Sequence, residues 1–187
     1  MGRRSWMVLC GAGAAALCGA LAWPALPAGA ATATANISAG SLAFVTSPPN
    51  VTFNDTLNGA NQTVNSNQAL DVSDGTGSGA GWSITATSTT FTTGSVTLST
   101  SATTVQSTPS TACDAGSACT LATNSVSYPY TLPAGASAPT ATKVFNAAVN
   151  TGQGNQTVTV TWQLAVPANT VAGTYTSTWT ISLVSGP

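Results

Sequence analysis

Few side chains of this chain could take part in acid–base or nucleophilic chemistry. The sequence contains no histidine, and its four acidic residues are all aspartate. Asp71 and Asp74 are close enough in sequence to suggest a carboxylate pair of the kind that cleaves glycosides. On a strand, residues three apart point to opposite faces, so these two would meet only if a turn began at Asp74. An ordinary turn at Asp74-Gly75 is the alternative interpretation.

A calcium site is a third interpretation of the same two residues. Calcium takes carboxylate and carbonyl oxygens as ligands, and loops rich in Gly and Asp supply both. The spacing of Asp71 and Asp74 matches no standard calcium loop, so the sequence does not decide whether they bind calcium. Because tuned acid and base groups are scarce, we predict no catalytic residues, no cofactor and no enzymatic activity.

Two pairs of cysteines occur in different parts of the chain. Cys10 and Cys18 lie in an apolar N-terminal run, whereas Cys113 and Cys119 lie within the remaining polar sequence. A zinc site would need four suitable ligands, and the chain has no histidine. Since an exported protein meets oxidising conditions, we expect a local disulfide between Cys113 and Cys119 and no metal.

Three tryptophans in the second part of the chain could stack on sugars. Aromatic faces suit carbohydrate CH groups, and the many uncharged Ser, Thr, Asn and Gln side chains could supply hydrogen bonds. Core burial is the usual place for such residues, and Trp162 and Trp179 are expected to face inward. Trp82 follows a glycine-rich turn at a strand end, where loops carry function. We therefore take Trp82, Asp74 and Trp179 as candidate ligand-binding residues.

The N-terminal residues have the pattern of a secretory signal peptide. The basic pair Arg3-Arg4 precedes an apolar run that extends to Trp23, and small residues follow Pro24. The run is shorter than a typical membrane anchor, which is the alternative. We predict a signal peptide over residues 1–35, cleaved between about residues 30 and 35, and one domain over 36–187. The mature protein is then secreted and extracellular or wall-associated.

The composition excludes several classes of partner. Only 4% of the residues are charged, and 43% are hydrophobic. After removal of the leader one lysine and four aspartates remain, which gives a net charge of −3. Such a chain cannot neutralise a phosphate backbone, so we expect no nucleic-acid binding. We also expect no attachment to anionic lipid and no membrane span in the mature protein.

Strict alternation of apolar and polar residues predicts short strands. The clearest runs are 158–166 and 175–183, which we expect to form a hairpin through a turn at 167–173. Further strands are expected at 37–44, 51–53, 69–73, 82–87 and 95–99. An edge strand is expected at 126–132, followed by a loop over 133–142. No helical periodicity follows the leader, so we predict an all-β protein with a single antiparallel β-sandwich or barrel-like domain.

Two tryptophan motifs together resemble the WxL-domain surface proteins of Gram-positive bacteria. The first is Gly81-Trp82-Ser83-Ile84, and the second runs from Tyr175 to Trp179-Thr180-Ile181. Both carry isoleucine (Ile84 and Ile181) where the family usually has leucine, and Gly75 follows Asp74 where a basic residue is common. Leu42-Ala43-Phe44 and Val51-Thr52-Phe53 fit the N-terminal part of the family.

The resemblance implies a secreted all-β domain that attaches non-covalently to the cell wall. Its expected partner is peptidoglycan or an associated wall glycan, together with other surface proteins. The alternative is a structural subunit, pilin-like or part of a surface layer, that assembles with itself or with other surface proteins through its edge strands.

Overall fold

The computed structural model describes residues 29–94 and 96–187, which contain twelve strands and no helix. Residues Ile37–Pro187 form one compact unit. The predicted signal peptide falls mostly outside the described residues and stays a prediction. In the described part of the chain, no helix is long and apolar enough to cross a membrane.

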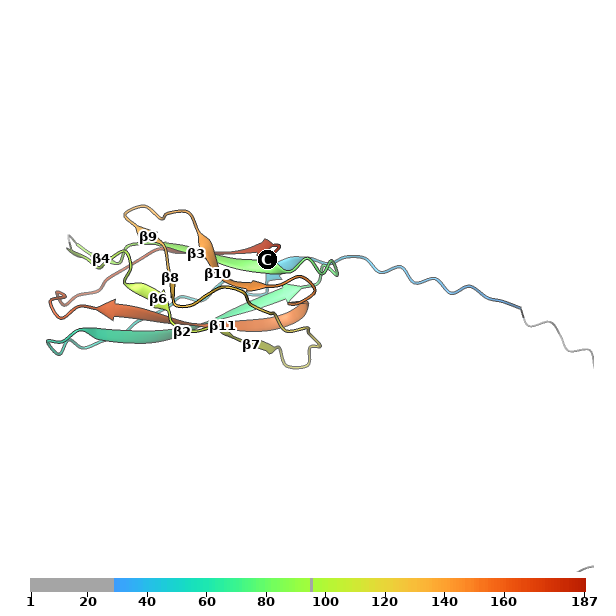
Figure 1. Cartoon of the computed structure of the whole chain (residues 1–187), viewed down its shortest axis with the longest axis horizontal. Coiled ribbons are helices and arrows are strands. Elements are labelled where there is room, and N and C mark those ends of the chain that lie inside the picture. Colours follow the sequence, from blue (N-terminus) through green and yellow to red (C-terminus); the bar gives the residue numbers. More distant parts are fainter. Residues whose placement is uncertain (1–28, 95) are drawn as a thin grey trace, which may run out of the picture. The chain divides into compact units, whose positions relative to one another are not determined.

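The first sheet is built around two long strands. β2 (Gln62–Asp74) and β11 (Gly154–Val166) pair antiparallel in continuous register over their whole length. β1 (Leu42–Phe44) pairs with the outer side of β2. On the other side of β11 lie β6 (Thr103–Val105) and β7 (Ser110–Cys113), and β8 (Tyr130–Thr131) pairs with β6 (Figure 1).

The second sheet has β3 (Trp82–Thr89) at its centre. β10 (Thr142–Ala147) and β12 (Trp179–Ser185) flank β3 antiparallel, and the two-residue β9 (Ala134–Gly135) adds a parallel contact. A small ribbon of β4 (Thr92–Thr93) and β5 (Val96–Thr97) forms a separate sheet.

The two sheets face each other across one main hydrophobic core, so residues 37–187 form a β-sandwich. The core contains alternate residues of β2 and β11 from the first sheet and residues of β3 and β10 from the second. The Trp162 and Trp179 rings, one from each sheet, meet edge to face with centroids 4.8 Å apart. The prediction of an all-β antiparallel domain is therefore confirmed, and both of these indoles face inward as expected.

The expected C-terminal hairpin is wrong. The alternating runs that contain Trp162 and Trp179 belong to opposite sheets, where β11 pairs with β2, β6 and β7 and β12 pairs with β3. Alternation identifies the buried face of each strand, but two facing sheets and one hairpin give the same pattern. Residues 167–178 therefore cross from one sheet to the other.

Four other segments differ from the prediction. The strand expected at 37–44 shortens to β1, and residues 51–53 form no strand, although Val51 and Phe53 pack against the core. No strand was predicted where β10 lies, and its first residue falls within the loop expected over 133–142. Where an edge strand was expected, Tyr128-Pro129 is a cis peptide bond and only β8 is regular.

Candidate functional site

An uncharged groove of about 630 Å³ opens on the side of the sandwich. Its walls are residues 48–52 on one side and residues 175–177 and 179–181 on the other, with Gln68 and Phe91. None of these residues carries a charge. The second wall includes the start of β12, so the groove lies where one edge of the second sheet begins.

Trp179 is the half-buried aromatic residue of this groove. Its ring packs on Trp162 and lies near Phe91 and Phe53, with centroid distances of 6.3 Å and 6.5 Å. The other two tryptophans of the described residues, Trp82 and Trp162, are 0% exposed. Trp179 thus combines a fixed position against the core with an indole that partly faces solvent.

The wall formed by residues 48–52 is held by a buried glutamine. The Trp162 Nε1–H donates a hydrogen bond to Gln68 Oε1 at 2.9 Å, and Gln68 Nε2 donates to the Pro49 carbonyl at 2.7 Å. Gln68 is 3% exposed, so these bonds satisfy a polar side chain that would be costly to bury alone. Gln68 was not among the residues predicted for the site. Its position in the inward-facing phase of β2, two residues before Leu70, is the signal that could have identified it.

A second groove of about 670 Å³ adjoins the first. The two share Val51, Thr52, Phe91 and Tyr175, and the second is lined by more apolar side chains. The Tyr175 hydroxyl donates to the Val171 carbonyl at 2.9 Å, which fixes the ring between the two grooves. The two grooves together contain one carboxylate, Asp55, which lines the second groove. A chain-like ligand could follow the pair from end to end.

Trp82 begins β3 directly after the glycine-rich segment, as expected, but it does not reach the surface. Its indole is fully buried, packs on Phe145 with centroids 5.9 Å apart, and donates from Nε1 to the Gly152 carbonyl at 2.9 Å. Trp82 lies opposite Ser185, whereas Trp179 lies opposite Ser88. Six residue steps along β3 therefore separate the two tryptophans, about 20 Å at roughly 3.4 Å per residue.

The remaining motif residues divide in the same way. Gly81 and Ile84 are buried with Trp82, and the Gly186 N–H donates to the Gly81 carbonyl at 2.9 Å. Tyr175 and Ile181 line the groove with Trp179. The first half of the sequence pattern thus lies at the start of β3, and the second half lies beside the far end of β3 and alone contributes to the groove.

Asp71 and Asp74 do not form a pair. Asp74 is buried, and its Oδ1 accepts hydrogen bonds from the Thr76 N–H at 3.1 Å and from Thr76 Oγ1 at 2.7 Å, so it stabilises an ordinary turn. Asp71 points to the opposite face of β2. Within residues 29–94 and 96–187, no group of three or more His, Cys, Asp or Glu side chains could hold a metal ion.

The carboxylate near Asp71 is Asp114, a pairing that was not predicted. Thr157 lies opposite Asp71 in the β2–β11 register, and its Oγ1 donates to Asp114 Oδ1 at 2.9 Å. Burial, followed by the charge and hydrogen bonding of Asp114, raises the pKa of Asp71 above its usual value. One Asp71 oxygen is buried without a hydrogen-bond partner.

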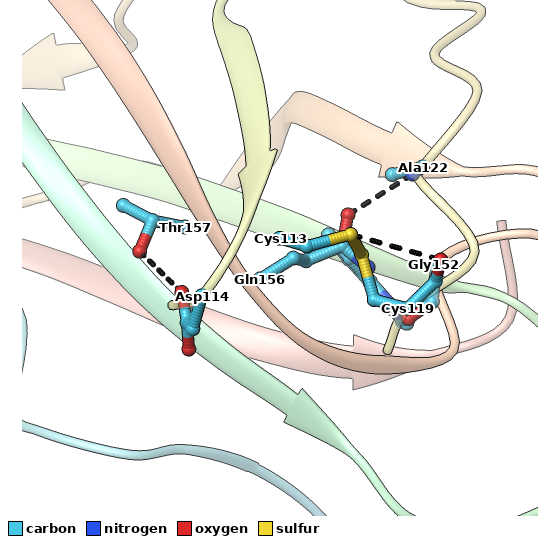
Figure 2. The surroundings of a disulfide bond; sticks show 8 residues. Cys113, Asp114, Cys119, Ala122, Gly152, Gln156 and Thr157 are labelled. Carbon is cyan, nitrogen blue, oxygen red and sulfur yellow. Dashed lines mark hydrogen bonds between the residues drawn. A yellow bond between two sulfur atoms is a disulfide. The ribbon is translucent and has the colours of Figure 1, made fainter. Parts of the chain in front are cut away.

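The expected disulfide joins Cys113 and Cys119. Figure 2 shows it beside Gln156, a fully buried side chain whose Oε1 accepts from the Ala122 N–H at 3.0 Å. The segment that follows the disulfide is hydrogen-bonded to the loop that contains Gly152, since the Gly152 N–H donates to the Thr120 carbonyl at 2.8 Å. The disulfide therefore belongs to the structural end of the domain that encloses Trp82.

Comparison with known proteins identifies the family. A family model described as WxL domain, surface cell wall-binding, matches residues 32–187. No curated protein and no solved structure matches the chain. The matched range covers all the strands described above, including both tryptophan motifs and the groove. The chain therefore belongs to the WxL domain family of surface, cell-wall-binding domains.

Proposed function

We propose that this secreted domain binds non-covalently to a wall glycan, peptidoglycan or a glycan associated with it, through the groove beside Trp179. The half-exposed indole in an uncharged groove carries the proposal. Stacking of a sugar on an aromatic face needs a ring that is held in place but not covered. Trp179 meets this requirement because Trp162 fixes it from the core side.

The polar groups of the groove suit a neutral ligand. Thr176, Ser177 and Thr180 contribute hydroxyl or backbone groups along one wall, and Asn50 and Thr52 lie along the other. Uncharged donors and acceptors can bond sugar hydroxyls without a charged partner. Adjacent apolar lining in the second groove would extend the contact along a polymer.

The same lining supports binding without hydrolysis. Glycoside cleavage by the usual route needs two carboxyl groups on opposite sides of the bond. Asp55 alone supplies a carboxylate to the two grooves, and it lies in the second one. We therefore infer that the domain holds its ligand and does not cleave it.

Matched tryptophan substitutions test the site. Purified peptidoglycan sacculi are mixed with the secreted protein and sedimented, and bound protein is measured over a range of concentrations. We expect Trp179→Phe to weaken binding several-fold, because it shortens the ring that faces the groove. Trp82→Phe makes the same chemical change about 20 Å away along β3 and should leave binding unchanged.

Fluorescence gives a second measurement of the same site. Soluble wall fragments should shield Trp179 from a collisional quencher, whereas the fully buried Trp82 and Trp162 are already shielded. Equal binding by Trp179→Phe and the unmodified protein would refute the groove as the site. Failure of the unmodified protein to sediment with any wall preparation would refute the function itself.

A further inference from the structure

β12 forms a free edge of the second sheet. The sheet order is β10-β3-β12, and among the described strands β12 pairs only with β3. β12 contains no proline, no charged residue and no shift in register along its length. An edge of this kind presents backbone groups to which another strand can add.

The register shows which backbone groups are free. The Thr89 N–H donates to the Thr178 carbonyl and the Gly186 N–H donates to the Gly81 carbonyl, each at 2.9 Å, in the register that continues along β12. Even-numbered residues of β12 therefore exchange hydrogen bonds with β3. In an antiparallel ladder the alternate residues direct their N–H and C=O groups to the other side. Trp179, Ile181, Leu183 and Ser185 thus face the free edge.

Other edges of the sandwich carry features that discourage pairing. β10 has Lys143 and a bulge between Lys143 and Phe145. β1 is three residues long, and β8 and β9 have two each. Beyond β1, the edge of β2 is covered by residues 45–49. The Val45 N–H donates to the Asp71 carbonyl, and the Gln68 side chain donates to the Pro49 carbonyl. Charge, bulges, short strands and covering segments are the usual protections. β12 has none of the first three, and residues 48–52 lie across the groove from its first three residues.

The free edge of β12 is complementary to itself. If a two-fold axis passes through Ser182, Ile181 of one copy lies opposite Leu183 of the second copy. Both residues direct their backbone groups to the edge, so they can exchange two hydrogen bonds, and Trp179 can do the same with Ser185 of the second copy. Apolar side chains then meet on the inner face, and uncharged Thr180 and Val184 meet on the outer face.

We propose that two copies of this domain associate through β12, antiparallel about Ser182, to form one continuous six-strand arrangement of their β10, β3 and β12 strands. The occupant is a second copy because the register about Ser182 pairs Ile181 with Leu183 on the inner face and brings no like charges together. All the charged side chains of residues 37–187, namely Lys143 and the four aspartates, lie outside β12. Val184, which is 48% exposed in the isolated chain, gains Thr180 of the second copy as a neighbour on the outer face.

Charge substitutions at the two-fold axis test the dimer. Sedimentation velocity over a range of protein concentrations should show a monomer–dimer equilibrium for the secreted protein. In Ser182→Lys two lysines face each other as a closely spaced pair without backbone bonds between them, so the dimer dissociation constant should rise roughly tenfold or more. Ser182→Asp should have the same effect alone.

An equimolar mixture of the two variants should dimerise again, because Lys then opposes Asp. This recovery separates a lost interface from a misfolded chain. Thr63→Lys, an exposed position on β2, adds the same charge and should dimerise like the unmodified protein. Val184→Lys provides a second interface variant. A protein that stays monomeric at all concentrations, that forms open polymers, or that dimerises equally with Ser182→Lys would overturn the proposal.

Discussion

Replacement of Gly152 by alanine tests whether the packing around the buried Trp82 requires a residue without a side chain at this position. Gly152 is buried, has a φ of +78°, and accepts the Trp82 indole hydrogen bond at its carbonyl. A Cβ placed there would lie 2.6 Å from Trp82 Nε1 and would also contact the Ala147 side chain. Neither neighbour can move freely, because both are fully buried.

The expected cost has two parts. A left-handed backbone costs a residue with a Cβ about 1–2 kcal/mol, offset in part by the smaller entropy of the unfolded chain, which leaves about 1 kcal/mol. Forcing an extra methyl group into a packed interior adds about 1–3 kcal/mol. Gly152→Ala should therefore lower the free energy of unfolding by about 2–4 kcal/mol, a large part of the roughly 5–15 kcal/mol typical of a domain.

Gly59→Ala is the matched control. Gly59 has nearly the same φ, +82°, but it is exposed and a Cβ there would meet nothing within 4 Å. It should show only the backbone cost, about 1 kcal/mol. Urea denaturation of both variants, with the disulfide intact, measures the difference. If Gly152→Ala loses no more stability than Gly59→Ala, steric crowding against Trp82 does not operate and the reasoning is refuted.

Three further predictions concern the disulfide and two titrating groups. Replacing Cys113 and Cys119 by serine should lower the unfolding free energy by about 2 kcal/mol, seen in denaturant midpoints, and an unchanged midpoint would contradict this. Burial raises the pKa of Tyr128 to about 12. The neutral hydroxyl therefore stabilises the folded protein fully below the ordinary pKa of 10, and this contribution is lost as the pH rises to about 12. The melting temperature of Tyr128→Phe should fall less over that interval, and parallel curves would count against the assignment. Burial and the neighbouring Asp114 raise the pKa of Asp71, so its ionised form costs stability at neutral pH. Asp71→Asn should therefore raise the melting temperature at pH 7 and not below the ordinary pKa of 3.8, whereas a loss of stability at pH 7 would be inconsistent with repulsion.

Period-two alternation predicted the strands whose two faces differ in solvent exposure. β11 follows this pattern closely, since Val158, Val160 and Trp162 are each 0% exposed. β10 could not be predicted in this way because Val144, Phe145, Asn146 and Ala147 are buried in succession around a bulge. A bulge shifts the phase of the side chains, and the remaining face is covered by other segments. Which sheet a strand joins depends on long-range pairing, which alternation does not report.

The site was only partly predictable for a similar reason. Trp179 was a candidate from its residue type and place, and it does line a groove. Trp82 has the same local signals, yet the loop that contains Gly152 covers it, and that loop is 70 residues away in sequence. The opposite wall of the groove depends on the bond between Gln68 and Pro49, a contact that no local pattern encodes.

Wall binding and dimer formation, as proposed above, use overlapping residues. Trp179 and Ile181 line the groove and also face the free edge of β12. Since a paired strand lies about 4.8 Å away, Ser185 of the second copy would sit beside Trp179 and occupy the groove next to it. A ligand that binds only the monomer shifts the equilibrium toward it by mass action.

Soluble wall fragments should therefore dissociate the dimer in sedimentation experiments. Residue 182 lies on the outer face, away from the indole, so the Ser182→Lys variant should bind wall fragments as tightly as the unmodified monomer. Its affinity for the fragments should not fall as the protein concentration rises. The unmodified protein should bind less well per chain at concentrations where it dimerises. Fragments that saturate Trp179 fluorescence without changing the dimer fraction would show that the two surfaces are independent.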